Sequence, residues 1–397
     1  MPSFITFGCW NNLFYNDRCS GSECYRDEVI GELNDYVREH TEVTDIMISG
    51  DNYYQNKLEF EMGDGKEKKY NQLIIQDIHS GFSLLRNAAK EIPIHMVYGN
   101  HDLLYVNKTF IIEDEYIAVR DNGYNKDALP SSIKPELLNM CIIRDEEDSA
   151  ARNNRINLRF NYFSKYGEHT LILMIDTSMY SDDFEKIKLC YRGSMDREEL
   201  QRGQNSEILG FIGEHLSRDS EIKNIIVIGH HPIIYRKFKK GKLNKSSKSN
   251  TSGSNIVSYE PKLANLFIQI HKLLSGQSIY YLCADFHVFE HGKITISDED
   301  GDPVEVNQYI VGTGGAKLDK LHQEGAETPP LPIGIDYEPI SSRSKHGFLV
   351  CNDPGNGDFT FEFIGLRETG KGLKRRKTRK LRKTRRRRHR RSSRLFY

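Results

Sequence analysis

The feature that most constrains how this chain folds is a repeated unit in which a short apolar run ends at a cluster of polar residues. The runs are Ser3–Gly8, Asp45–Gly50, Ile94–Tyr98, Thr170–Ile175, Asn224–Ile228 and Ser278–Cys283. Short runs rich in β-branched residues are typical of buried strands. Because the carboxyl ends of parallel strands share one edge of a sheet, we expect the polar clusters to meet along a single crevice.

Segments with helical periodicity separate several of these runs, which is typical of an α/β fold. They are Tyr25–His40, Asn71–Ile92 and Asp196–Leu216. Beyond Cys283 the pattern becomes strand-like throughout and predicts a series of antiparallel strands. The expected strands are Lys293–Ser297, Asn307–Val311, Gly347–Cys351 and Asp358–Ile364.

The expected fold is therefore α/β (α+β), with two mixed β-sheets packed as a sandwich and flanked by helices. One domain is expected to cover residues 1–368, and residues 369–397 are expected to form a separate disordered tail. Two polar stretches, Arg144–Arg155 and Lys237–Asn255, are expected to be loops that interrupt the domain. Charged, Ser-rich and Gly-rich sequence buries too little apolar surface to fold into a core.

The tail differs in composition from the rest of the chain. Residues 371–397 contain 16 Lys or Arg and no acidic residue, which leaves 40 basic against 56 acidic residues elsewhere, a formal charge of −16. Repulsion among these cations predicts disorder, and dense Arg favours salt-sensitive binding to DNA, RNA or another polyanion. A nuclear-import signal, an anionic membrane surface and the protein's own acidic body are the alternatives.

The seven cysteines are spread along the chain without the spacing of a zinc finger, which favours a reducing compartment. No stretch approaches the roughly 18 apolar residues that a spanning helix requires. We therefore expect a soluble intracellular protein, cytoplasmic or nuclear. The tail also resembles those of packaged proteins of large DNA viruses.

Four of the polar clusters carry side chains that bind metal ions. They are Gly50-Asp51-Asn52, Gly99-Asn100-His101-Asp102, Gly229-His230-His231-Pro232 and Asp285-Phe286-His287. Two cations about 3.5–4 Å apart repel each other, so a pair of metal ions needs an anionic oxygen between them, and Asp51 is the candidate bridge. The other candidate donors are an amide oxygen, two imidazoles and a phenolate, from Asn100, His230, His287 and Tyr54.

Taken together, these clusters resemble the ordered motifs of the calcineurin-like metallophosphoesterases, over about residues 4–315. Within that superfamily the chain is most similar to purple acid phosphatases. The similarity lies in Tyr54, three residues after Asp51, and in the glycine turn at residues 311–315.

The resemblance implies a dinuclear site of iron, zinc or manganese that hydrolyses a phosphate ester with hydroxide supplied by the metals. It also implies that His101 protonates the leaving alcohol and that Asp102 positions His101. His231 is expected to belong to the same catalytic set.

Two positions depart from the family pattern, and both keep an atom that binds metal. Cys9 stands where the first motif has aspartate. A nearby dication would lower the pKa of its thiol, so that the thiolate would be a ligand for zinc or iron. Asp285 stands where the last motif has histidine, so an oxygen replaces a nitrogen donor. The alternative for Cys9 is a small buried hydrophobic residue at a lost metal position.

Three functions remain open from the sequence. The first is hydrolysis of a phosphate monoester. The second is a catalytically impaired phosphoesterase fold that binds phosphorylated partners and is anchored to nucleic acid by its tail. The third is a phosphodiesterase or nuclease to which the tail delivers DNA or RNA. The segment Tyr235–Lys239 either grips a phosphate or begins the Lys-rich loop.

Overall fold

The structure, a computed structural model, gives the fold over most of the chain. The described residues are 2–11, 25–52, 54, 81–103, 156–158, 162–182, 184, 196–239, 254–297, 302–324 and 326–367. Residues Met1–Gly365 form one compact unit. The predicted loop at Arg144–Arg155 and the basic tail at 369–397 lie outside the described residues, so both stay predictions.

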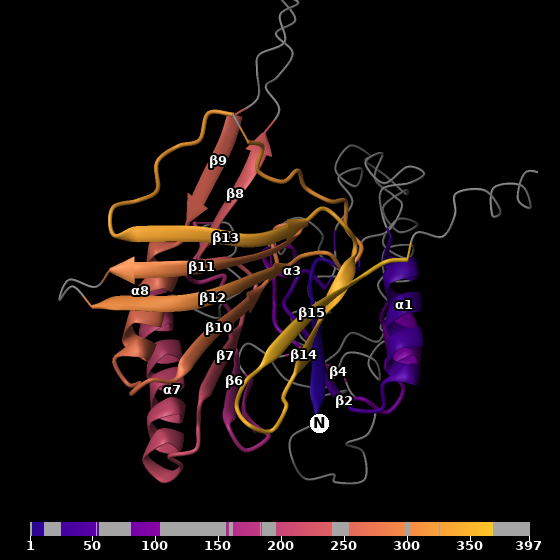
Figure 1. Cartoon of the computed structure of the whole chain (residues 1–397), viewed down its shortest axis with the longest axis horizontal. Coiled ribbons are helices and arrows are strands. Elements are labelled where there is room, and N and C mark those ends of the chain that lie inside the picture. Colours follow the sequence, from indigo (N-terminus) through magenta and orange to yellow (C-terminus); the bar gives the residue numbers. More distant parts are fainter. Residues whose placement is uncertain are drawn as a thin grey trace, which may run out of the picture. The chain divides into compact units, whose positions relative to one another are not determined.

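The first large sheet combines four parallel strands with two antiparallel ones (Figure 1). Its parallel strands are β1 (Ser3–Phe7), β2 (Val43–Ile48), β3 (Ile94–Met96) and β4 (Ile156–Leu158), and its antiparallel strands are β14 (Gly347–Asn352) and β15 (Thr360–Gly365). The spatial order is β15-β14-β1-β2-β3-β4. β1 lies near the centre and all its side chains are buried, which explains its largely apolar sequence.

The second large sheet has four parallel strands in the middle and antiparallel strands toward both edges (Figure 1). In spatial order its strands are β13 (Ile335–Arg343), β11 (Phe289–Ser297), β12 (Pro303–Val311), β10 (Ser278–Cys283), β7 (Asn224–Ile228), β6 (Thr170–Met174) and β5 (Tyr162–Tyr166). β12, β10, β7 and β6 run parallel. Two large mixed sheets confirm the predicted α/β class.

The strands nearest the carboxyl end differ in part from the predicted antiparallel series. β12 pairs antiparallel with β11 but parallel with β10, so it joins the parallel block to the antiparallel one. β14 and β15 belong to the other sheet, where β14 pairs with β1. The sequence predicts no strand at β13, because Tyr337 is the one buried side chain of that strand and no apolar alternation results.

Aromatic side chains fill space between the two sheets. Phe361 of β15 contacts Tyr309 of β12 and Tyr280 of β10, with ring centroids 4.4 and 5.0 Å apart. Phe363 stacks on Phe289 of β11 at 4.3 Å. Because each of these contacts joins one sheet to the other, the sheets pack face to face as a sandwich.

Helices lie against both sheets (Figure 1). The longer ones are α1 (Arg26–Glu39), α7 (Arg197–Arg218) and α8 (Pro261–His271). Tyr36 of α1 contacts Phe348 of β14 in the first sheet, and Phe267 of α8 contacts Tyr281 of β10 in the second. None of the helices in the described part of the chain is long and apolar enough to cross a membrane.

Two of the three predicted helical segments are present almost in full, as α1 and α7. The third, Asn71–Ile92, is helical at residues 81–89, and its first ten residues lie outside the described part. No helix is predicted at α8. Its buried residues Leu263, Phe267 and Ile270 nevertheless have the spacing of one helix face, which was the available signal.

A pair of antiparallel strands replaces part of the predicted Lys-rich loop. The strands are β8 (Ile234–Lys239) and β9 (Ser254–Tyr259). The prediction of a loop over Lys237–Asn255 is therefore wrong at both ends, and residues 240–253 lie outside the described part. Tyr235 of β8 packs on Phe286 with ring centroids 3.4 Å apart. The many charged residues of this segment favour a loop prediction and give no sign of this contact.

Replacing Phe361 with alanine should weaken the contact between the sheets, because it removes the ring that touches Tyr280 and Tyr309. Truncating a packed aromatic residue costs about 3–5 kcal/mol, and Phe361 is only half-buried, so we expect the free energy of unfolding to fall by about 2 kcal/mol. Urea denaturation measures the change. The exposed neighbour Glu362, changed to glutamine, is the matched control, and equal midpoints for the two variants would contradict this role of Phe361.

Candidate metal centre

Three strands end in a backbone conformation that residues other than glycine rarely adopt. Cys9 follows β1, Asp51 follows β2 and Asp285 follows β10, with φ angles of 55°, 53° and 53°. This left-handed region costs about 1–3 kcal/mol for a residue with a side chain and occurs mainly at functional sites. Among the other non-glycine residues that the structure describes, only Lys90 shares it. The strain therefore points to a common site at the three strand ends.

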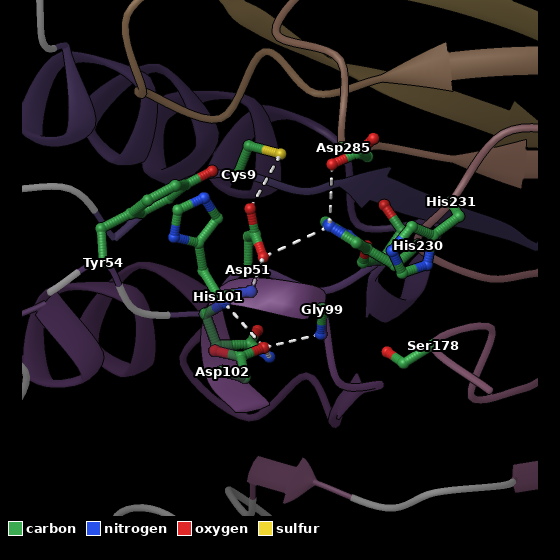
Figure 2. Close-up of polar contacts among 12 residues, drawn as sticks. Cys9, Asp51, Tyr54, Gly99, His101, Asp102, Ser178, His230, His231 and Asp285 are labelled. Atoms are coloured by element: carbon green, nitrogen blue, oxygen red, sulfur yellow. Dashed lines mark hydrogen bonds and ion pairs between the residues drawn. The ribbon is translucent and has the colours of Figure 1, made fainter. Parts of the chain in front are cut away.

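The side chain of Asp51 lies at the centre of these strand ends (Figure 2). It is 1% exposed. Sγ of Cys9 lies 3.8 Å from Oδ2 of Asp51, and Nε2 of His230 lies 3.3 Å from Oδ1. The backbone N–H of His101 also donates to Oδ1, at 3.0 Å. The two oxygens of the Asp51 carboxylate thus face different groups: Oδ2 faces the Cys9 thiol, on the sulfur side, and Oδ1 faces the His230 imidazole, on the imidazole side.

Three donor groups gather around Asp51 on its sulfur side. One ligand atom each from Cys9, Asp51 and His287 lie within 4.8 Å of one another. The hydroxyl of Tyr54 lies 3.0 Å from Nε2 of His287, and Nδ1 of the same ring lies 2.7 Å from the carbonyl oxygen of Lys317. Because a carbonyl only accepts, Nδ1 carries the ring proton and Nε2 presents its lone pair to the cluster.

On the other side of Asp51, His230 faces two carboxylates. Its Nδ1 lies 2.8 Å from the carbonyl oxygen of Ser49 and therefore carries the proton of the neutral ring. Its Nε2 has no hydrogen-bond partner among the described residues and lies 3.3 Å from Asp51 and 3.7 Å from Asp285. A lone pair directed at two carboxylates is unfavourable unless a proton or a metal cation lies between them.

Burial and charge shift the pKa values of this cluster. Burial and the carboxylate of Asp51 raise the pKa of Cys9 and that of Tyr54 well above their usual values. Burial lowers the pKa of His230, but the neighbouring carboxylates outweigh it and raise that pKa. Burial also acts to raise the pKa of Asp51, yet His230 keeps it below its usual value. Asp51 is therefore the anion of the cluster, and a bound cation would deprotonate its neighbours.

The donor atoms fit a metal ion in type and spacing. Ligands around a tetrahedral zinc ion lie about 3.3–3.8 Å apart, since bonds from zinc to nitrogen, oxygen and sulfur are about 2.0–2.3 Å long. The 3.8 Å between Cys9 and Asp51 and the 3.3 Å between His230 and Asp51 fall in that range. Thiolate, imidazole and carboxylate together suit zinc or iron. The residues present therefore fit a cation bound at Asp51.

Two glycines leave the space that this cluster occupies. A Cβ atom at Gly99 would lie 2.3 Å from the backbone nitrogen and from Oδ1 of Asp51, and 2.8 Å from Cε1 of His230. Gly50 has a φ of 87°, and a Cβ atom there would lie 2.7 Å from Nδ1 of His230. Gly50 thus permits a left-handed turn of the backbone, whereas Gly99 is required for space.

The short helix α3 (Asn100–Leu103) begins at the same cluster. Asn100 is buried at its first position. The ring of His101 lies 4.5 Å from the ring of Tyr54, and burial lowers the pKa of His101. His101 is half-buried as a residue, its backbone N–H is bonded to Asp51, and Nδ1 of its ring is buried.

One carboxylate oxygen of Asp102 accepts three hydrogen bonds from the turns that follow β2 and β3. Its Oδ2 accepts the backbone N–H groups of Gly99 and Asn52 at 2.8 and 3.2 Å and the side-chain amide of Asn52 at 3.0 Å. Burial and Asp51 raise the pKa of Asp102 to about 7. Asp102 therefore holds two strand-end turns together, and its predicted action on His101 stays a prediction.

His231 lies beside His230, but its ring takes part in another network. Oγ1 of Thr177, just beyond β6, lies 3.0 Å from Nδ1 of His231. Ser178, drawn in Figure 2, has a buried hydroxyl without a hydrogen-bond partner among the described residues. The sequence motifs predict no role for Thr177 or Ser178, although β6, like β2, β3, β7 and β10, is followed by a polar cluster.

The structure brings six of the predicted ligands to one place. They are Cys9, Asp51, Tyr54, His230, Asp285 and His287. Cys9 also packs against Ala284 and Ala316, as its alternative role as a small hydrophobic residue requires. Its sulfur nevertheless faces a carboxylate, which a purely apolar role does not explain.

No protein-family model matches the chain, and no curated protein matches it. Among solved structures, the crystal structure of TT1561 of Thermus thermophilus is similar, with 10% sequence identity and a TM-score of 0.31. The match covers 79% of this chain and 91% of that chain. A likeness of this size says nothing about function.

Replacing Gly99 with alanine should displace Asp51 and weaken metal binding, because the added methyl group overlaps its backbone and carboxylate. Changes beside metal ligands reduce metal affinity about 10–100-fold, and we expect a loss in that range. Calorimetric titration of the full chain with zinc measures it. Gly213→Ala in α7, where an added Cβ has no neighbour within 4 Å, is the matched control. Equal zinc affinities would contradict the crowding around Asp51.

Proposed function

We propose that this chain is a metal-dependent phosphoesterase of the calcineurin-like superfamily, with its site centred on Asp51. The observation that carries the proposal is the convergence of three strained strand ends on one buried carboxylate. Donor atoms from both large sheets meet there, since Cys9 follows a strand of one sheet and Asp285 a strand of the other. The order of the motifs along the chain supports the same superfamily.

Two cations on opposite sides of Asp51 would complete the site. The ligands would be Cys9, Tyr54 and His287 on one side and Asn100, His230 and Asp285 on the other. When bound, such ions lower the pKa of water, which supplies hydroxide near neutral pH, and offset the charge of the phosphoryl group. The thiolate of Cys9 favours zinc or iron over manganese on its side.

His101 is the group that we assign to protonation of the leaving alcohol. Its backbone N–H is bonded to Asp51, its ring lies against Tyr54, and the residue is only half-buried. A general acid must reach the leaving oxygen within hydrogen-bond distance, and a half-buried residue beside Asp51 can do so for an ester that enters from solvent.

A covalent mechanism through Cys9 fits the site poorly. Burial and Asp51 raise the pKa of its thiol, so in the absence of a cation the sulfur stays protonated and is a weak nucleophile. The sulfur also faces a carboxylate, whereas activated cysteines face cationic groups. We therefore assign Cys9 as a ligand.

A phosphoesterase fold that binds phosphorylated ligands without hydrolysing them is the second candidate. Asp285 favours it, because this carboxylate lies 3.7 Å from His230, where the family pattern has a neutral histidine, and its extra charge opposes an anionic substrate. The third candidate, a nuclease, depends on delivery of DNA or RNA by the basic tail.

Hydrolysis of an aryl phosphate by the full chain with zinc or manganese tests the proposal. We expect turnover that a chelator abolishes and that Asp51→Asn lowers at least about 10³-fold, because the shared charge between the cations is lost. Asp358→Asn, an exposed carboxylate before β15, is the matched control and should keep wild-type activity.

The choice of ester separates the three candidates. Faster turnover of the monoester supports a phosphatase, and faster turnover of the aryl diester supports a nuclease or phosphodiesterase. A protein that binds metal but hydrolyses neither ester would contradict the proposal and favour the binding function.

A further inference from the structure

Thr177 lies just beyond the end of β6 and contacts His231, which lies just beyond the end of β7. The last paired residues of these strands are Met174 and Ile228, and Thr177 and His231 each follow three residues later. The backbone N–H of Ile175 continues the ladder by donating to the carbonyl oxygen of Ile228 at 2.8 Å. Thr177 and His231 are both buried, so their contact is fixed by the sheet.

Oγ1 of Thr177 contacts three nitrogen atoms. The backbone N–H groups of His230 and His231 donate to it at 3.0 and 2.9 Å. Nδ1 of His231 lies 3.0 Å away. A hydroxyl oxygen has two lone pairs, which the two N–H groups occupy, so the hydroxyl proton goes to Nδ1. Nδ1 then accepts, and the ring proton of neutral His231 is on Nε2.

Tyr281 of β10 holds the same turn from the opposite side. Its hydroxyl donates to the carbonyl oxygen of His231 at 2.5 Å. Gly229 packs against both residues, since a Cβ atom there would lie 2.4 Å from Cγ2 of Thr177 and 2.7 Å from the Tyr281 hydroxyl. His231 is thus fixed through its N–H, its carbonyl and one ring nitrogen, which leaves its ring one orientation.

We infer that Thr177 is a positioning residue that holds His231 in the Nε2–H tautomer. In this form the buried Nε2–H of His231, whose ring lies against that of His230, would be a donor for a phosphoryl oxygen of an ester bound at the site. The use of the tautomer in catalysis rests on the proposed function, whereas the tautomer itself does not.

The hydroxyl of Tyr281 is the competing acceptor for the Thr177 proton. If Thr177 donated to Tyr281, Nδ1 of His231 would carry the proton, and Oγ1 would receive three N–H groups with two lone pairs. The tautomer of His231 therefore shows whether Thr177 donates its proton to His231 or to Tyr281.

Nitrogen NMR of the full chain, labelled with ¹⁵N at histidine and freed of metal by a chelator, reads the tautomer directly. The variant H231Q assigns the signals. We expect Nδ1 of His231 to be unprotonated and Nε2 to be protonated in the wild type and in T177S, which keeps the hydroxyl. T177V removes the hydroxyl and should shift His231 toward the Nδ1–H form.

Hydrolysis of the aryl phosphate, measured well below the melting temperature of each variant, tests the catalytic part. We expect T177V to lower kcat about 10–100-fold with KM unchanged and T177S to restore most of it. A protonated Nδ1 in the wild type, or a T177V spectrum like that of the wild type, would overturn the inference. If T177V does not fold, the wild-type spectrum and T177S decide. The expected tautomer without any wild-type hydrolysis would uphold the positioning and refute the proposed function instead.

Discussion

The buried charge of Asp51 is the constraint on which the rest of the site depends. A carboxylate that is 1% exposed has lost most of its hydration, so nearby groups must stabilise it. Without a metal, His230 in its protonated form, which the neighbouring carboxylates favour by raising its pKa, and the backbone N–H of His101 supply part of that stabilisation, at 3.3 and 3.0 Å from Oδ1. A metal cation would supply more and would convert Cys9 and Tyr54 from neutral neighbours into anionic ligands. The groups around Asp51 can therefore stabilise its charge without a metal, and they would stabilise it more strongly with one.

The two sheets make this concentration of charge possible. β1 and β2 deliver Cys9 and Asp51 from one sheet, and β7 and β10 deliver His230 and Asp285 from the other. Each of these four residues follows the carboxyl end of a strand that pairs parallel with a neighbour. Face-to-face packing through rings such as that of Phe361 fixes the distance between the two sets. The surrounding packing also sustains the left-handed backbone at three of the strand ends.

The sequence predicts six of the eight parallel strands in the described part of the chain and most of the polar clusters, because a strand buried on both faces needs a continuous apolar run. It does not predict β4, and it assigns β12 to the antiparallel series. β13 and the β8–β9 pair are not predicted. Each has few buried side chains, such as Tyr337 in β13 and Tyr235 in β8, so its sequence shows no alternation of apolar and polar residues. The contacts of Asp102 and Thr177 are not predicted for another reason. Hydrogen-bond partners depend on which turns become neighbours, and only the folded sheets decide that.

The central claim is that Asp51 anchors a bound cation together with Cys9 and His287. Anomalous diffraction from crystals of the full chain grown with zinc tests it most directly. The account predicts an anomalous peak about 2.0–2.3 Å from the Asp51 carboxylate, the Cys9 sulfur and Nε2 of His287. Zinc found only at other positions, with none beside Asp51, would contradict it.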